Sequence, residues 1–212
     1  MGFAQKAFSI FTRDVFLFVL GVFTSIVIAR KLGPELLGLW VIISLIPVYA
    51  EAFGRIKFDV AAIYFIGKNK YNENEILYHL NFIAIIASVI IVMIILIFKE
   101  NIIQILFNGE SNNLIFIYAI IPIIPLNFLC LNYTYLLISR EDVKSYNYII
   151  IIRALIGSGG ACLLLLLFDF GIWSLITTSV ASVLIALIYA RWRLVITNFR
   201  SKIIFKLNKA LL

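Results

Sequence analysis

The chain has 212 residues, of which 63% are hydrophobic and only 14% are charged. An ordinary soluble domain has roughly 45–50% apolar and about 25% charged residues. Long apolar runs that account for such an excess are typical of proteins that cross a membrane several times. This composition excludes a soluble enzyme, a disordered tail and a secreted disulfide scaffold.

Several apolar runs follow one another along the chain. Their lengths are close to the roughly 20 residues that a membrane-spanning helix needs. We expect six spans, at about 15–30, 36–54, 80–98, 114–138, 146–168 and 171–190. The runs lack the apolar and polar alternation of membrane β-barrel strands. The sequence therefore predicts an all-α, polytopic membrane protein with a single six-helix transmembrane bundle over 1–212, which ends in a basic cytoplasmic tail at 191–212.

The positive charges indicate which side of the membrane each loop occupies. The net charge is +7, and with a cytoplasmic N-terminus 14 of the 18 Lys and Arg residues fall inside. Only Arg30, Lys31 and Lys99 then lie outside, and Arg153 lies within a span. The positive-inside rule predicts that both termini are cytoplasmic. The basic excess thus indicates topology and contact with membrane lipids rather than nucleic-acid binding.

Residues for catalysis or metal binding are scarce. The chain has one histidine, His79, with no second His or Cys at a ligand spacing. Cys130 and Cys162 fall within apolar spans, where a thiol behaves as a small buried residue. We therefore expect no enzyme activity, no metal site and no bound cofactor.

Arg153 is the residue within a span that most suggests a function. An ionisable side chain inside the hydrocarbon region is costly unless it faces a wet cavity or a partner. Gly157 and Gly160 follow at helical spacing, so one stripe of this helix combines a cation with small residues. The alternative is an anchor whose long side chain reaches the headgroups from about 10 Å deep.

Glu51, Arg55 and Asp59 are spaced by four residues at the end of the second expected span. On a continuing helix this spacing places an acid, a base and an acid on one face. One interpretation is a solvated ladder of charges at the membrane interface. The other is a gate or an ion-coupling cluster at the mouth of a cavity.

Two other spans carry polar residues. Asp14 begins a weakly polar stripe that either packs against a neighbouring helix or lines an aqueous cavity. Pro122 and Pro125 predict a bend in the fourth span, with Asn127 and Asn132 facing inward beyond it.

A family resemblance begins at the turn Ala29-Arg30-Lys31-Leu32-Gly33-Pro34-Glu35-Leu36-Leu37-Gly38. Gly33 suits the C-cap of one helix and Pro34 the first position of the next. The sequence of this segment resembles the first hairpin of bacterial polysaccharide-biosynthesis flippases, in the multidrug/oligosaccharidyl-lipid/polysaccharide exporter superfamily. Further segments fit the same pattern in order, at 53–55, 59–65, 105–107, 121–126 and 145–148.

The resemblance implies a function in O-antigen, capsule or exopolysaccharide synthesis. Members of the family move a polyprenyl-pyrophosphate-linked oligosaccharide across the bacterial cytoplasmic membrane by alternating access between two six-helix lobes. A cationic cavity would compensate the pyrophosphate charge. The candidate substrate-binding cations here are Arg153, Arg30 and Arg55. The candidate gate or coupling residues are Glu51, Asp59 and Asp14, with an H⁺ gradient, a Na⁺ gradient or the membrane potential as the driving force.

The chain is about half the typical length of that family, so the resemblance implies an N-terminal lobe of a two-lobe transporter. Its partner would be a C-terminal lobe or a second copy of itself. Two alternatives stay open. One is a lobe of a cation-coupled drug or metabolite antiporter of the same superfamily, and the other is a membrane subunit that transports nothing.

Overall fold

The computed structural model describes the backbone of residues 3–55, 73–107 and 113–210, and their side chains apart from those at 3, 6, 74, 106 and 195–210. Within these ranges the chain is helical and has no strands. The elements are α1 (Phe3–Gly54), α3 (Glu73–Ile97), α4 (Lys99–Leu106), α5 (Leu114–Ile120), α6 (Ile123–Ser139), α7 (Val143–Ala154), η2 (Leu155–Gly159), α8 (Gly160–Leu167) and α9 (Ile172–Ala210).

Five helical stretches of the described residues are long and apolar enough to cross a membrane. They are Ala7–Gly54, Glu75–Ile97, Leu114–Ser139, Val143–Leu167 and Ile172–Leu194. Many large apolar side chains on their outward faces are exposed, including Phe18 at 72% and Ile97 at 69%. An exposed apolar surface of this extent is costly in water. The long apolar helices therefore suggest a membrane protein.

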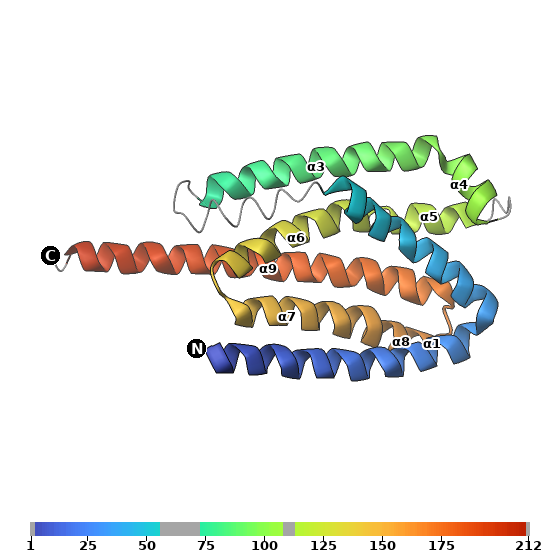
Figure 1. The fold of residues 1–212 in the computed structure, drawn as a ribbon, viewed down its shortest axis with the longest axis horizontal. Helices are drawn as coiled ribbons and strands as arrows, with labels where there is room; N and C mark the ends of the chain where they lie inside the picture. Colours follow the sequence, from blue (N-terminus) through green and yellow to red (C-terminus); the bar gives the residue numbers. More distant parts are fainter. Residues whose placement is uncertain (1–2, 56–72, 108–112, 211–212) are drawn as a thin grey trace.

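Helix α1 covers two of the expected spans and changes direction between them at Gly33. This residue has φ 71° and ψ 175°, which breaks the helical geometry inside the 52-residue element. Glycine tolerates this conformation because it has no Cβ, and Pro34 then suits the start of the next helical segment. In Figure 1 the second half of α1 accordingly runs back across the bundle towards α3. The turn predicted from Gly33 and Pro34 is present.

The fourth expected span is interrupted at its prolines. Helix α5 ends at Ile120 and α6 begins at Ile123, so Pro122 occupies the break. A proline has no N–H with which to continue the helical ladder. Beyond the break, α6 turns Asn127 and Asn132 into the protein, where they are 7% and 3% exposed.

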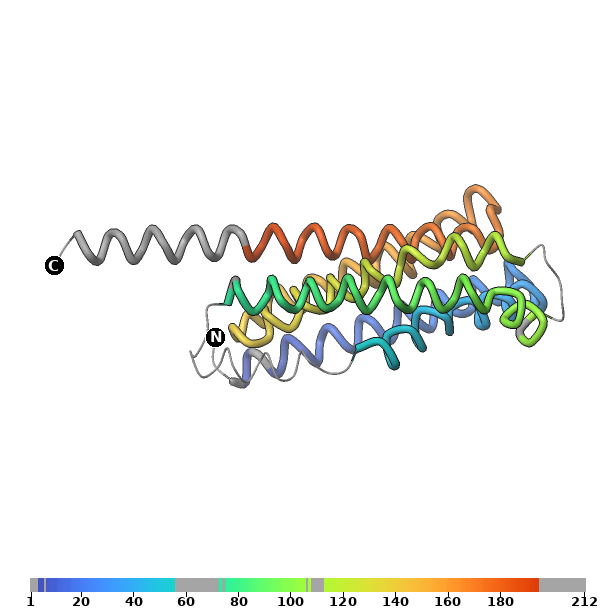
Figure 2. The backbone as a smooth tube through the Cα atoms, turned by 90° about the horizontal axis from the view of Figure 1, so that it is seen from above, coloured from blue at the N-terminus to red at the C-terminus, as the bar shows by residue number. Residues whose placement is uncertain are grey.

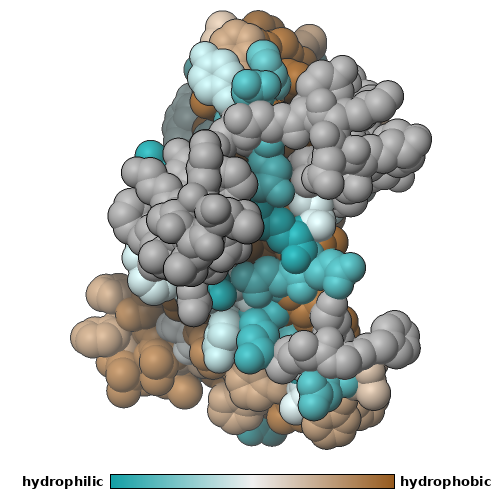
Figure 3. Space-filling model, turned by 90° about the vertical axis from the view of Figure 1, so that its left-hand side faces the viewer, coloured by the Kyte–Doolittle hydropathy of each residue, from teal (hydrophilic) through white to brown (hydrophobic). Residues whose placement is uncertain are grey.

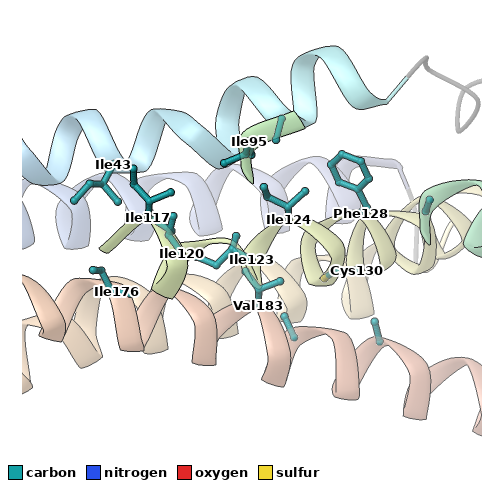
Figure 4. Packing of buried hydrophobic residues seen from close by; sticks show 14 of the residues in the cluster. Ile43, Ile95, Ile117, Ile120, Ile123, Ile124, Phe128, Cys130, Ile176 and Val183 are labelled. Carbon is teal, nitrogen blue, oxygen red and sulfur yellow. The ribbon is translucent and has the colours of Figure 1, made fainter. Parts of the chain in front are cut away.

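Helix α6 occupies the centre of the bundle, in contact with α3 on one side and α9 on the other. The first half of α1 lies along α7 and α8, as Figures 1 and 2 show from two directions. The core is formed by buried residues from several helices, among them Ile43, Ile117, Ile124 and Phe128 (Figure 4). Cys130 belongs to this core and Cys162 is also buried, which confirms their prediction as buried thiols.

The last helix differs from its expected bounds. We expected the sixth span to end near residue 190 and a tail to follow, but α9 continues as one helix to Ala210. The charged residues in this stretch do not stop the helix because Arg and Lys are good helix formers. In Figure 1, α9 extends well beyond the other helices.

Candidate functional site

A cavity with several polar side chains in its wall lies between the second half of α1 and helices α5, α6, α7 and α9. Its volume is about 250 Å³, a little below the roughly 300–1,000 Å³ of typical small-molecule sites. Its charged and amide side chains are Glu51 from α1, Asn127 from α6 and Arg153 from α7. Ser44 and Ser182 add hydroxyl groups from α1 and α9. The fold therefore brings together polar side chains from four apolar helical stretches.

Glu51 and Asn127 are joined directly. The Nδ2 group of Asn127 donates a hydrogen bond of 2.6 Å to Oε2 of Glu51. Asn127 is 7% exposed, and its Oδ1 atom is buried without a hydrogen-bond partner in the described structure. An unpaired buried acceptor is costly, so this atom is suited to a donor or a cation that enters the cavity.

Arg153 is half-buried at the cavity wall. It is the eleventh residue of the helical stretch Val143–Leu167, about 15 Å along the helix at 1.5 Å per residue. Among the residues that the structure describes, Arg153 makes neither an ion pair nor a hydrogen bond. Its guanidinium group is thus available to an anion, with five N–H donors.

The helix changes its geometry immediately after Arg153. Residues Leu155–Gly159 form a π-helical turn, η2, and such turns occur frequently at functional sites. Gly157 in this turn and Gly160 at the start of α8 face α9, and the approach is tight at Gly160. A Cβ atom at Gly157 would lie 3.5 Å from Oγ of Ser182, and one at Gly160 would lie 3.2 Å from Cγ2 of Thr178.

Arg55 belongs to a separate polar network between α1, α3 and α6. Its Nη2 donates to Oδ1 of Asn132 at 3.1 Å, and its guanidinium lies 5.2 Å from the ring centre of Tyr135. The amide of Asn132 then donates to Asn81 at 3.2 Å. Glu51 and Arg55 are therefore both held by asparagines of α6, and they lie in different networks. The third member of the expected ladder, Asp59, is outside the described residues.

The other two predicted site residues do not line this cavity. Arg30 is exposed, close to the turn at Gly33. Asp14 accepts hydrogen bonds from Arg13, with a distance of 2.7 Å from Nη2 to Oδ1. The Nη1 atom of Arg13 also donates to Asn147 at 2.8 Å. Arg30 and Asp14 thus both lie on α1, away from the cavity that Glu51 and Arg153 line.

Sequence reasoning recognised Asn127 as inward-facing but missed its bond to Glu51. It also missed the cavity hydroxyls, Ser44 and Ser182. Polar residues within apolar spans were the available signal, because such side chains need internal partners. For metals, no group of three or more His, Cys, Asp or Glu side chains that could hold an ion occurs within the described ranges.

Comparisons of the chain with protein-family models, with curated proteins and with solved structures find no match.

Proposed function

We propose that the chain is a six-helix membrane lobe of a transporter for a lipid-linked oligosaccharide, in the cytoplasmic membrane of a bacterium. The observation that carries this proposal is the position of Arg153. It combines a location about 15 Å along an apolar helix, a place on the cavity wall, and no ion pair or hydrogen bond with any described side chain. A charge in this position needs a counter-charge, and a transported anion supplies one.

Six spans follow if the two halves of α1 cross the membrane separately. The conformation of Gly33 supports this division because it turns the chain back after the first apolar segment. Both termini then lie on the same side, which the distribution of Lys and Arg favours as the cytoplasm.

The pyrophosphate of a polyprenyl-linked oligosaccharide is the anion that we assign to Arg153. A guanidinium group binds phosphate oxygens in a bidentate manner, and it does so more strongly in a site that excludes water. Glu51 places an opposite charge in the same cavity. We assign it the uptake of H⁺ or Na⁺ when the pyrophosphate binds, so that part of the added negative charge is compensated.

An antiporter lobe for cationic drugs or metabolites is the second candidate. The observation in its favour is a pair of acceptors in one cavity, the carboxylate of Glu51 and the free Oδ1 of Asn127. A cationic cargo would bind these two groups and be repelled by Arg153.

Binding to the purified lobe in nanodiscs separates the two candidates. We expect a polyprenyl-pyrophosphate-linked oligosaccharide to bind more tightly than the corresponding polyprenol, and a cationic dye to bind weakly. Arg153→Met should lower the affinity for the pyrophosphate ligand at least about tenfold, as the loss of a charge-assisted hydrogen bond to phosphate predicts. Arg153→Lys should restore part of the affinity, because it returns the charge without the bidentate geometry.

Arg30→Met is the matched control, since Arg30 is an exposed cation outside the cavity. It should leave binding unchanged. An equal loss in Arg30→Met and Arg153→Met, or tight dye binding that depends on Glu51, would contradict the flippase proposal.

Alternating access requires a second lobe, either a C-terminal six-helix body or a second copy of this chain. Flipping in liposomes should therefore need that partner, and transport by a demonstrated monomer would contradict the one-lobe proposal.

The topology is tested by cysteine labelling in a chain whose Cys130 and Cys162 are replaced by alanine. A cysteine at Asn113 should react from outside the cell, and one at Lys144 only after permeabilisation. The opposite pattern would contradict the orientation.

A further inference from the structure

A second and larger groove lies where the first turns of α1 and α7 run side by side. Its volume is about 1,140 Å³, above the roughly 300–1,000 Å³ of typical small-molecule sites. Its apolar walls are Phe8 and Phe16 from α1, with Tyr148 and Ile151 from α7. This groove is separate from the cavity of Arg153, and the two share no lining residue.

The two helices that form the groove are parallel. Arg13 contacts Asn147 near the start of the helices, and Lys31 contacts Asp169 near their far end, at 2.8 Å in each case. Both residues of the second contact lie further along the chain than those of the first, so the two helices run in the same direction. The groove between them therefore follows the helix axes. It lies towards the end of the bundle where α1 begins. Figure 3 shows this end with a band of hydrophilic residues through its middle and hydrophobic residues towards its edges.

Partly buried polar bonds form the floor of the groove. Asn147 donates from Nδ2 to Oγ of Ser9 at 2.9 Å and accepts from Nη1 of Arg13. The Arg13 side chain is 9% exposed, and its guanidinium lies 5.3 Å from the ring centre of Tyr146. Three of its five N–H groups are donated within the protein, because Nε and Nη2 both bond Asp14. The floor is thus a fixed structure with some donor capacity left.

The free charge at this groove is positive. Lys144 lines it, is exposed, and forms neither an ion pair nor a hydrogen bond with any described residue. Asp14 already neutralises the charge of Arg13, so the charge of Lys144 is the excess positive charge at this groove. From Lys144 to Ile151 the wall changes from charged to apolar over seven residues, about 10 Å at 1.5 Å per residue. A ligand complementary to this gradient has an anionic head and a hydrocarbon tail.

We propose that this groove binds one anionic phospholipid. Its phosphate lies at Lys144, with the free donors of Arg13 beside it, and an acyl chain lies between Phe8, Phe16, Tyr148 and Ile151. A basic side chain at the membrane surface attracts anionic headgroups, and the apolar walls shield the chain. A second copy of this protein is a poor occupant, since it would bring a further net charge of +7 to a cationic groove. This inference goes beyond the proposed transport and needs only that the chain is in a membrane.

The test is lipid binding to the delipidated full chain in detergent, measured by native mass spectrometry. Phosphatidylglycerol and phosphatidylcholine with identical acyl chains are the two probes. We expect one phosphatidylglycerol to be retained with about fivefold preference, the effect of one basic residue facing an anionic lipid. Lys144→Gln should reduce the preference below about twofold.

Three controls make the result decisive. Lys99→Gln removes a cation from the start of α4, outside the groove, and should keep the preference. The double variant Phe8→Ala and Tyr148→Ala should weaken the binding of both lipids. Circular dichroism verifies that each variant is folded. Excess inorganic phosphate should not compete, because the acyl chain contributes to binding.

The proposal is overturned if the chain shows no preference, if the preference survives in Lys144→Gln, or if Lys99→Gln loses as much as Lys144→Gln. Competition by excess inorganic phosphate would identify a free-anion site and overturn the lipid assignment. None of these outcomes concerns the pyrophosphate ligand, so the transport proposal stands or falls separately.

Discussion

The amide of Asn127 donates a 2.6 Å hydrogen bond to the carboxylate of Glu51, while the Oδ1 atom of the same amide is buried and has no partner in the described structure. The bond orients the Glu51 carboxylate at the wall of the cavity that Arg153 also lines. The cavity therefore presents fixed acceptors on one part of its wall and a guanidinium donor on another.

The bond between Glu51 and Asn127 predicts different effects of two substitutions at residue 51. Glu51→Ala removes the acceptor and leaves a buried amide unpaired, which should lower the free energy of unfolding by about 1–3 kcal/mol. Glu51→Gln keeps a carbonyl acceptor and should cost less than about 1 kcal/mol. Reversible unfolding in detergent micelles measures both. An equal loss in the two variants would show that charge, and not the hydrogen bond, holds this contact.

Gly33 has a conformation, φ 71° and ψ 175°, that is essentially restricted to glycine. Gly33→Ala should therefore destabilise the fold by about 1–3 kcal/mol. Gly38 provides the control in the same element, because it has no positive φ and a Cβ there would meet nothing within 4 Å. Gly38→Ala should be neutral or stabilising by up to about 1 kcal/mol. Thermal unfolding of the two variants checks the difference, and the reverse order would refute it.

Gly54 allows α1 to approach α3 and α6. A Cβ atom there would lie 2.0 Å from Cδ1 of Ile91 and 2.9 Å from Cζ of Phe128. Gly54→Ala should cost about 1–3 kcal/mol through overpacking. Ile91→Val removes the Cδ1 atom, so adding it to Gly54→Ala should recover part of the loss.

The control for Gly54 is Gly21→Ala, since a Cβ at Gly21 would meet no atom within 4 Å. Chemical denaturation of the three variants tests the expected order of stability. A double variant less stable than Gly54→Ala alone would contradict the assigned clash.

Asp142 caps the first turn of α7 and predicts a specific pH dependence. Burial alone would raise the pKa of this carboxyl, but hydrogen bonds from the hydroxyl and backbone of Ser145, together with the charge of Arg193, outweigh it and lower the pKa. The ionised form is thus favoured in the folded state. Its contribution to stability is complete above the unfolded pKa of about 3.9 and is lost as the pH falls through the lower folded pKa.

Asp142→Asn tests this dependence because asparagine is also a good N-cap but has no charge. Unfolding of the two chains between pH 2 and pH 6 should converge towards the acid end, with the variant less stable at pH 6. Parallel curves over the whole range would show that the charge of Asp142 does not contribute.

Several local features could be predicted from the sequence. The turn at Gly33 and the break at Pro122 follow from backbone chemistry. Glycine tolerates φ above zero, and proline has no N–H to continue a helix. The inward orientation of Asn127 follows from the cost of exposing an amide to hydrocarbon. In contrast, the spacing of Glu51 and Arg55 did not predict their bonds to α6, where Asn127 donates to Glu51 and Asn132 accepts from Arg55.

The helical class, the long apolar segments and the points where they break can be derived from local sequence, because they depend on residues that are near one another in the chain. The contacts of Glu51 with Asn127 and of Arg13 with Asn147 span 76 and 134 residues, and they depend on how the helices pack in three dimensions. Helical periodicity specifies the face on which a side chain lies. It does not specify which helix packs against that face, because apolar surfaces are largely interchangeable until packing and buried polar partners select one arrangement.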